Sequence, residues 1–180
     1  SWTKELIKTC KEAKIEFMTT PYDIDAIESL KKYVPAFKVG SGDVTYYNLL
    51  LHLSKSGKPI ILATGASTMS EVKDAVDLIL RKNKNLCIMQ CNTNYTNDPK
   101  NFNFINLNVI KKFNEIWPDI PLGLSDHTKG HTTVLGAISL GATVIEKHFT
   151  DNNKRIGPDH HFAMNPKTWR NMIDASRELE

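Results

Sequence analysis

The chain has 180 residues, of which 41% are hydrophobic and 24% charged, and its formal net charge is +3. This composition is typical of a globular protein with one sizeable core, and the length is too short for two large domains. Basic residues are dispersed among acidic ones, so the sequence lacks the clustered charge of a nucleic-acid-binding groove. Anionic small substrates remain compatible with the mild excess of positive charge.

The cysteines and the hydropathy pattern bear on the cellular compartment. Cys10, Cys87 and Cys91 are odd in number and lack a disulfide-framework spacing, which indicates a reducing compartment. No stretch approaches the length of a membrane span, and no signal peptide opens the chain. We therefore expect a cytoplasmic protein without a membrane partner.

Short apolar runs rich in β-branched residues alternate with amphipathic stretches along the chain. One such stretch, Met69–Lys82, places its apolar residues on one helix face, and Thr68 with Glu71 predicts a capping box at its start. The alternation predicts parallel strands joined by crossover helices. The expected strands are Ile15–Met18, Ala36–Val39, Ile60–Ala63, Leu86–Gln90, Leu122–Leu124 and Thr143–Lys147.

Polar or glycine residues follow almost every expected strand. A doubly wound sheet concentrates its chemistry at one switch point, whereas a barrel brings all its strand ends to one face. The pattern therefore favours an α/β fold of the TIM-type (β/α)8 barrel class. Because a closed barrel has eight strands, we expect residues 1–180 to form a partial β/α-barrel catalytic domain of about six units, with the two N-terminal units absent.

His127 and His148 end two consecutive expected strands, which one helix, Thr132–Leu140, separates. Neighbouring strands lie roughly 5 Å apart, so the two imidazoles can bind one divalent ion and leave positions open for water and substrate. Asp159, on the loop after His148, offers a third ligand. The alternative is that both histidines are hydrogen-bonded polar residues at a loop-lined rim, and spacing alone does not decide between the two interpretations.

A second group of residues suggests an anion site. Lys38 lies at a strand end before the turn Gly40-Ser41-Gly42, which offers a cation, a hydroxyl and backbone N–H groups to an oxyanion. Thr20, on the preceding strand end, adds a hydroxyl. The alternative is a tight turn without a ligand. Tyr95 either faces the same site or packs its own loop.

The sequence resembles the sialic acid synthase (N-acetylneuraminate synthase) family, which includes the legionaminic and pseudaminic acid synthases. The resemblance covers nearly the whole chain in order. It is carried by the segments Phe17–Asp23, Phe37–Asp43, Pro59–Gly65, Gly123–Thr128, Glu146–Thr150 and Gly157–His160.

The resemblance implies a condensation of phosphoenolpyruvate with an N-acetylated amino sugar, classically N-acetylmannosamine, to a nine-carbon 2-keto acid with release of phosphate. It assigns His127 and His148 to a divalent metal, Mn²⁺ with Mg²⁺ or Co²⁺ as alternatives, which polarises the aldehyde of the sugar. The full-length parent is expected to be a homodimer. The residues matching phosphoenolpyruvate-binding positions are Thr20, Lys38, Ser41 and Ser125, and those matching sugar- or metal-side positions are Tyr95 and Asp159.

The sequence also departs from the family pattern. Ala63 replaces a serine of the family, and Thr93 stands where some members have asparagine, although its hydroxyl can still bind substrate. The essential glutamate and lysine of the family's first strands, and its C-terminal antifreeze-like domain, are not found in the sequence. Two alternatives therefore stand beside a sialic acid synthase: a synthase acting on a diacetamido sugar, and a non-catalytic fragment that binds metal or anion.

Overall fold

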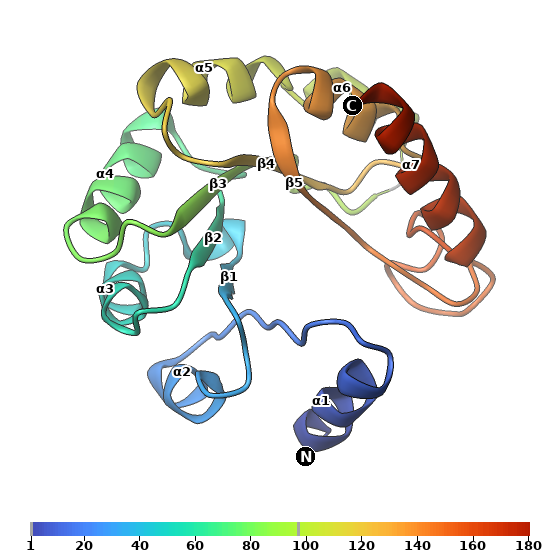
Figure 1. The fold of residues 1–180 in the computed structure, drawn as a ribbon. Coiled ribbons are helices and arrows are strands. Elements are labelled where there is room, and N and C mark those ends of the chain that lie inside the picture. Colours follow the sequence, from blue (N-terminus) through green and yellow to red (C-terminus); the bar gives the residue numbers. More distant parts are fainter. Residues whose placement is uncertain (1, 97) are drawn as a thin grey trace. The chain divides into compact units, whose positions relative to one another are not determined.

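The computed structural model describes residues 2–96 and 98–180, which form an alternation of helices and strands (Figure 1). In chain order the elements are α1 (Thr3–Glu12), α2 (Ile24–Leu30), β1 (Phe37–Val39), the 3₁₀ helix η1 (Ser41–Asp43), α3 (Tyr47–Lys55), β2 (Ile60–Ala63), α4 (Met69–Leu80), β3 (Leu86–Cys91), the 3₁₀ helix η2 (Pro99–Phe104), α5 (Asn108–Ile116), β4 (Leu122–Asp126), α6 (Thr132–Ser139), β5 (Ala142–Lys147) and α7 (Pro166–Leu179).

The described strands form a parallel sheet in the order β1-β2-β3-β4-β5, which is their order in the chain. A doubly wound sheet reverses its strand order at a switch point, and this sheet does not. Consecutive parallel strands with a helix between them are the repeating unit of a β/α barrel. The topology therefore confirms the predicted α/β class and favours the barrel over the doubly wound alternative.

The first of two compact units comprises the described residues up to Leu62 together with Ser67–Leu86. In it β1 pairs in parallel with β2, with Phe37 opposite Ile60, and α3 packs against α4. Helix α4 begins at the predicted capping box: the Thr68 hydroxyl accepts the Glu71 N–H, and the Glu71 carboxylate accepts the Thr68 N–H at 2.7 Å. A cap of this kind contributes about 1 kcal/mol to the start of a helix.

The strand expected at Ile15–Met18 is not present. Within the first unit only Thr19 forms a bridge, with Phe37, and the segment before it has no strand pairing among the described residues. Ile15 is 62% exposed and Met18 39% exposed, so these apolar residues are not buried as in a core strand. The sequence pattern identified an extended, apolar segment, but a strand also requires a hydrogen-bonded partner.

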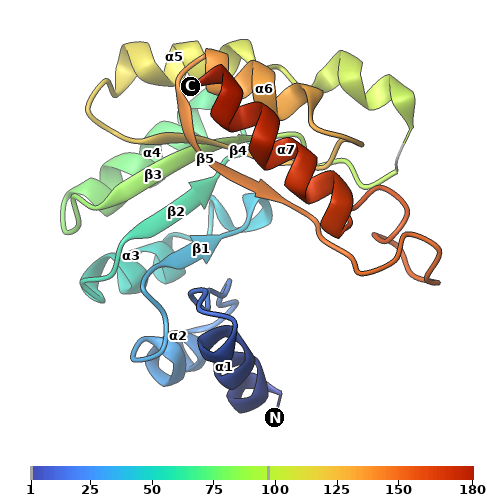
Figure 2. The ribbon, with the colours of Figure 1, turned by 45° about the vertical axis from the view of Figure 1, so that its right-hand side comes forward.

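The second compact unit comprises Ala63–Ala66 and Cys87–Glu180. Its strand β3 pairs with β4, and β4 pairs with β5. Helices α5 and α6 pack on β4, α6 also contacts β5, and α7 packs against α6 (Figure 2). All six residues of β3 are buried, which explains its nearly continuous apolar sequence.

Close packing in the second unit depends on a glycine in the middle of the sheet. A Cβ atom on Gly123 of β4 would lie 2.6 Å from the carbonyl oxygen of Val144 and 3.0 Å from the side chain of Met89. No larger residue can occupy this position without a shift of β5. The β4–β5 pairing also changes register between Leu122 and Gly123.

Two smaller expectations concern the cysteines and the membrane. Cys87 and Cys91 are both buried in β3, and neither forms a disulfide. Among the helices of the described residues, none combines the length and the apolar character needed to cross a bilayer.

Candidate active site

His127 and His148 lie directly after the paired ends of β4 and β5 in the second unit. Asp126 and Lys147 are the last partners in the β4–β5 register, and each histidine is the next residue along its chain. The two imidazole ring centroids are 5.0 Å apart, with the ring planes at 55°. His127 is only 4% exposed, whereas the side chain of His148 is 30% exposed. The structure thus brings together the two residues that the sequence assigns to a metal.

Aromatic rings surround this histidine pair. The ring of Tyr95 lies 4.4 Å from that of His127 and 5.5 Å from that of His148, measured between centroids. Phe162, which is 2% exposed, contacts the His148 ring at 5.2 Å. Tyr95 therefore joins the site rather than merely packing its own loop. Phe162 was not predicted as a site residue, because an apolar side chain carries no signal of chemistry in the sequence.

Asp159 reaches the histidine pair from the loop after β5. Its carboxylate Oδ2 lies 3.5 Å from Nδ1 of His148. A carboxylate next to one ring nitrogen orients an imidazole and favours the tautomer whose other nitrogen carries the lone pair. The structure therefore places Asp159 next to His148, and its role as a third metal ligand stays a prediction.

The surroundings of His148 also affect its protonation. Partial burial lowers the pKa of the His148 imidazole below its ordinary value, and the neighbouring His127 lowers it further. The carboxylates of Asp159 and Glu146 act in the opposite direction without reversing the shift. His148 is consequently neutral at neutral pH, which is the form in which an imidazole can donate its lone pair to a metal.

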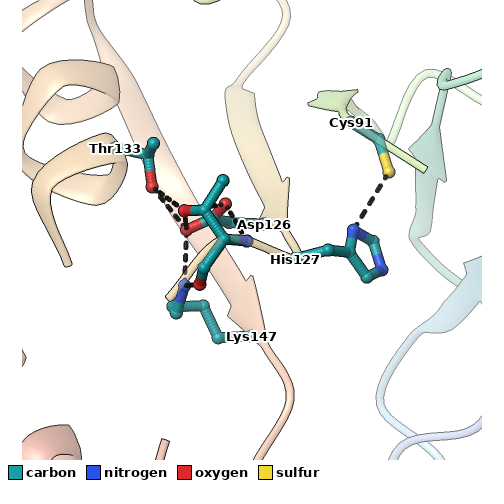
Figure 3. Close-up of polar contacts among 6 residues, drawn as sticks. Cys91, Asp126, His127, Thr133 and Lys147 are labelled. Carbon is teal, nitrogen blue, oxygen red and sulfur yellow. Dashed lines mark hydrogen bonds and ion pairs between the residues drawn. The ribbon is translucent and has the colours of Figure 1, made fainter. Parts of the chain in front are cut away.

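Cys91, at the end of β3, lies behind His127. Its sulfur is 3.8 Å from Nδ1 of His127 (Figure 3). The same sulfur is 3.5 Å from the hydroxyl of Thr93. Ligating histidines usually direct the second ring nitrogen to a neighbouring acceptor, and a thiol sulfur can serve as a weak one. Each imidazole of the pair thus has a polar neighbour at Nδ1.

The donor atoms of these residues are of the types that bind a divalent metal ion, but they do not form a complete set of ligands. Two imidazoles with a nearby carboxylate suit borderline divalent ions such as Mn²⁺, Co²⁺ or Zn²⁺. Within residues 2–96 and 98–180, no group of three or more histidine, cysteine or acidic side chains is arranged to hold a metal ion. The ion predicted from the sequence therefore stays a prediction that rests on His127 and His148.

The expected substrate-binding residues fall into both units. In the second unit, the hydroxyl of Ser125 donates to the Glu146 carboxylate at 3.1 Å, and Thr93 is exposed next to Cys91. Glu146 was not predicted as a site residue, although it stands in the segment Glu146–Thr150.

In the first unit, the backbone N–H of Lys38 donates to the carbonyl of Thr19 at 3.1 Å, which brings Thr20 next to the end of β1. Ser41 opens the 3₁₀ helix η1, directly after Gly40. All three predicted residues, Thr20, Lys38 and Ser41, are partly buried, and they come from one end of β1. The Gly40-Ser41-Gly42 turn is therefore a short helical turn that can present a hydroxyl and N–H groups together.

A pocket with a mainly apolar lining lies at the loop that follows His127. Its lining residues are Asp98, Pro99, Asn101, Phe102, Thr128 and Lys129. Asn101 is 3% exposed, and its side-chain Nδ2 has no hydrogen-bond partner among the described residues. The pocket offers charged and amide groups of the kind that bind hydroxyl-rich ligands.

These features define a β/α protein with a histidine pair after the ends of β4 and β5 and a short helical turn after β1. The model of the NeuB family matches residues 1–180, and the chain belongs to this family. It is 33% identical over 181 residues to the N,N'-diacetyllegionaminic acid synthase of Campylobacter jejuni, covering 98% of this chain and 53% of that protein. It is also 33% identical over 178 residues to human N-acetylneuraminate-9-phosphate synthase, covering 98% of this chain and 49% of that protein.

Solved structures support the same fold. The spore coat polysaccharide biosynthesis protein of Bacillus subtilis superposes with a TM-score of 0.92 at 31% identity, over 99% of this chain and 50% of that one. The phospho-2-dehydro-3-deoxyheptonate aldolase of Thermotoga maritima superposes with a TM-score of 0.79 at 14% identity, over 98% and 54%, which shows likeness of fold alone. The chain thus spans about half the length of the relatives it matches.

Proposed function

We propose that the chain provides the metal-binding and anion-binding residues of a synthase that condenses phosphoenolpyruvate with an N-acetylated amino sugar. The observation that carries this proposal is the pair His127 and His148, which directly follow in-register residues of β4 and β5 with ring centroids 5.0 Å apart. Membership of a family whose relatives are named as acid synthases supports it. The homodimeric state and the cytoplasmic location stay predictions.

In this proposal His127 and His148 hold the metal through their imidazole nitrogens. A bound divalent ion supplies Lewis acidity to the aldehyde oxygen of the open-chain sugar. Asp159 and Cys91 orient the two rings from behind. The Tyr95 ring covers the histidine pair and offers its hydroxyl to the acceptor sugar.

The other substrate, phosphoenolpyruvate, is bound in this proposal by Lys38, Ser41 and Thr20. Lys38 supplies a positive charge to the phosphate or carboxylate of phosphoenolpyruvate, and the hydroxyls of Ser41 and Thr20 donate hydrogen bonds to it. The reaction forms a bond between the methylene carbon (C3) of phosphoenolpyruvate and the aldehyde carbon of the sugar. Water adds to C2, the carbon that carries the phosphate, phosphate then leaves from C2 by C–O cleavage, and the product is a 2-keto sugar acid.

The direct test is an assay of the 180-residue chain with Mn²⁺, phosphoenolpyruvate and N-acetylmannosamine. We expect release of inorganic phosphate that requires all three components. The variant His148→Ala should abolish this release. Phosphate release that is independent of the sugar would contradict a condensation. Mn²⁺ binding without any turnover would instead support the fragment that binds metal or anion without catalysis.

The acceptor sugar is a second question for the same assay. Similarity to the Campylobacter legionaminic synthase equals that to the human sialic acid enzyme, at 33% each. A diacetamido sugar is therefore the competing acceptor, and parallel reactions with the two sugars at equal concentration compare them. We expect faster release of phosphate with N-acetylmannosamine, and the reverse order would reassign the chain to the legionaminic or pseudaminic type.

A further inference from the structure

A buried ion pair is formed by the two residues that directly precede His127 and His148. Asp126 and Lys147 face each other across β4 and β5 as register partners, and both side chains are 2% exposed. Figure 3 shows Asp126 grouped with Thr133 and Lys147, while the His127 side chain points away from them toward Cys91. The ion pair therefore occupies the opposite side of the β4 end from the imidazole of His127.

Every charged atom of this pair has hydrogen-bond partners. The Asp126 carboxylate accepts from the Thr128 N–H at 2.9 Å and from the Thr128 hydroxyl at 2.8 Å, and its other oxygen accepts from Thr133 and Lys147. The Lys147 ammonium also donates to the carbonyl of Thr128 at 2.7 Å. The network thus ties together the ends of β4 and β5, the residue after His127, and the first turn of α6.

The energetics of buried charge indicate what this network contributes. Removing two ions from water is costly, and a well-packed apolar pair of similar size is often at least as stable. Stability alone therefore does not account for a fully satisfied ion pair at this point. An apolar pair makes no directional contacts. The hydrogen bonds of the ion pair do, and they fix the position of the backbone on both sides of His127 and immediately before His148.

We propose that Asp126 and Lys147 are positioning residues that hold His127 and His148 at the separation their common ligand requires, acting through the backbone of β4 and β5. The β4–β5 pairing shifts register at the opposite end, between Leu122 and Gly123, so the ladder is irregular there and the ion pair fixes the end that carries the histidines. For the metal itself, the inference rests on the proposed function.

The test compares charge removal with restoration of packing. Asp126→Asn and Lys147→Met each leave one buried charge without its partner, and we expect a lower melting temperature and weaker Mn²⁺ binding. The double variant Asp126→Leu with Lys147→Met removes both charges, so its melting temperature returns toward that of the unaltered chain. Its Mn²⁺ affinity is still expected to be about 10- to 100-fold weaker, as for other residues that orient ligands.

Two further variants separate positioning from stability. Met172→Ala in α7, a buried position outside the Asp126–Lys147 hydrogen-bond network, lowers the melting temperature and is expected to leave Mn²⁺ affinity unchanged. Thr133→Val removes a single donor to Asp126, is expected to fold, and weakens Mn²⁺ binding a few-fold. Unchanged Mn²⁺ affinity in every folded variant of the network would overturn the inference.

A metal-free readout distinguishes this inference from the proposed function. If the unaltered chain binds no Mn²⁺, the metal assignment is contradicted. The positioning of the histidine rings by Asp126 and Lys147 can still be tested through the imidazole Hε1 proton resonances of His127 and His148. The adjacent rings shift these resonances, so they report ring placement. We expect the double variant to move or split both resonances, and identical spectra for the two proteins would overturn the positioning role.

Discussion

The end of β4 and β5 and the end of β1 both carry predicted site residues, but they hold them differently. His127 is nearly fully buried and is flanked by buried Asp126 and Thr128, which belong to a continuous hydrogen-bond network. Thr20, Lys38 and Ser41 are only partly buried, and they come from a three-residue strand, a three-residue 3₁₀ helix and an irregular segment.

This difference matches the demands of the two proposed ligands. A metal ion requires its donor atoms at defined distances, so ligands on long paired strands with buried support are favourable. A phosphate or carboxylate accepts hydrogen bonds from many directions, and a short turn with a hydroxyl, N–H groups and a lysine suffices. Substitutions at the histidine end should therefore have large effects on ligand affinity and stability, and substitutions at the β1 end should have smaller ones.

The largest expected effect is loss of a histidine. His127→Ala or His148→Ala removes one of two imidazole donors, so we expect Mn²⁺ affinity to fall about 1000-fold, or about 4 kcal/mol. Titration of Mn²⁺ followed by electron paramagnetic resonance of the free ion measures it. Lys38→Met is the control, because it removes a charge from the β1 end and should leave Mn²⁺ affinity unaltered. Equal affinities in all three variants would contradict the metal assignment.

The next effect tests the packing beneath the histidine end. Gly123→Ala places a methyl group 2.6 Å from the carbonyl of Val144, so β5 must shift, and we expect a loss of about 2–3 kcal/mol in the free energy of unfolding. Gly42→Ala, in the turn after β1, is the matched control. Its new Cβ meets nothing within 4 Å, and we expect a change within about 0.5 kcal/mol.

Urea denaturation followed by circular dichroism compares these two glycine variants with the unaltered chain. If Gly42→Ala were as destabilising as Gly123→Ala, the turn after β1 would be as tightly constrained as the centre of the second unit's sheet. The contrast between the two regions would then be lost.

A smaller effect is expected at the β1 end. Lys38→Met removes a hydrogen bond from a charged donor, which contributes about 2 kcal/mol, so affinity for phosphoenolpyruvate should fall about 30-fold. Isothermal titration calorimetry measures this, with His148→Ala as the variant that retains the β1 end. Unchanged phosphoenolpyruvate affinity in Lys38→Met would show that Lys38 does not bind the anion.

The fold could be predicted from the sequence to a large extent because its signals are local. The alternation of apolar strands with amphipathic helices gave the α/β class, and the Thr68–Glu71 pair located the start of α4. The segment Ile15–Met18 was wrongly predicted as a strand, since strand formation depends on a partner that the local sequence does not show.

The site was predictable where chemistry and position coincide, as for His127 and His148 at the strand ends. The residues that support the two histidines were not predictable from the sequence. Asp126 and Lys147 belong to residue types that are rarely buried, so the sequence gives no reason to place them inside the protein. The geometry of Asp159 against Nδ1 of His148 also depends on how the loop after β5 folds back, which residue spacing does not determine.

The smallest expected effect is on protonation at the histidine end. Burial and the proximity of His127 lower the pKa of His148, so the folded chain binds this proton less readily than the unfolded chain does. Stability is therefore unaffected by this group at neutral pH, and it declines as pH falls through the range between the unfolded and the folded pKa. In His127→Ala one of the lowering influences is gone, and the pKa of His148 should rise. Proton NMR titration of metal-free protein measures both values, and a His148 pKa at or above 6.5 in the unaltered chain would show that the pair is more open to water than its packing indicates.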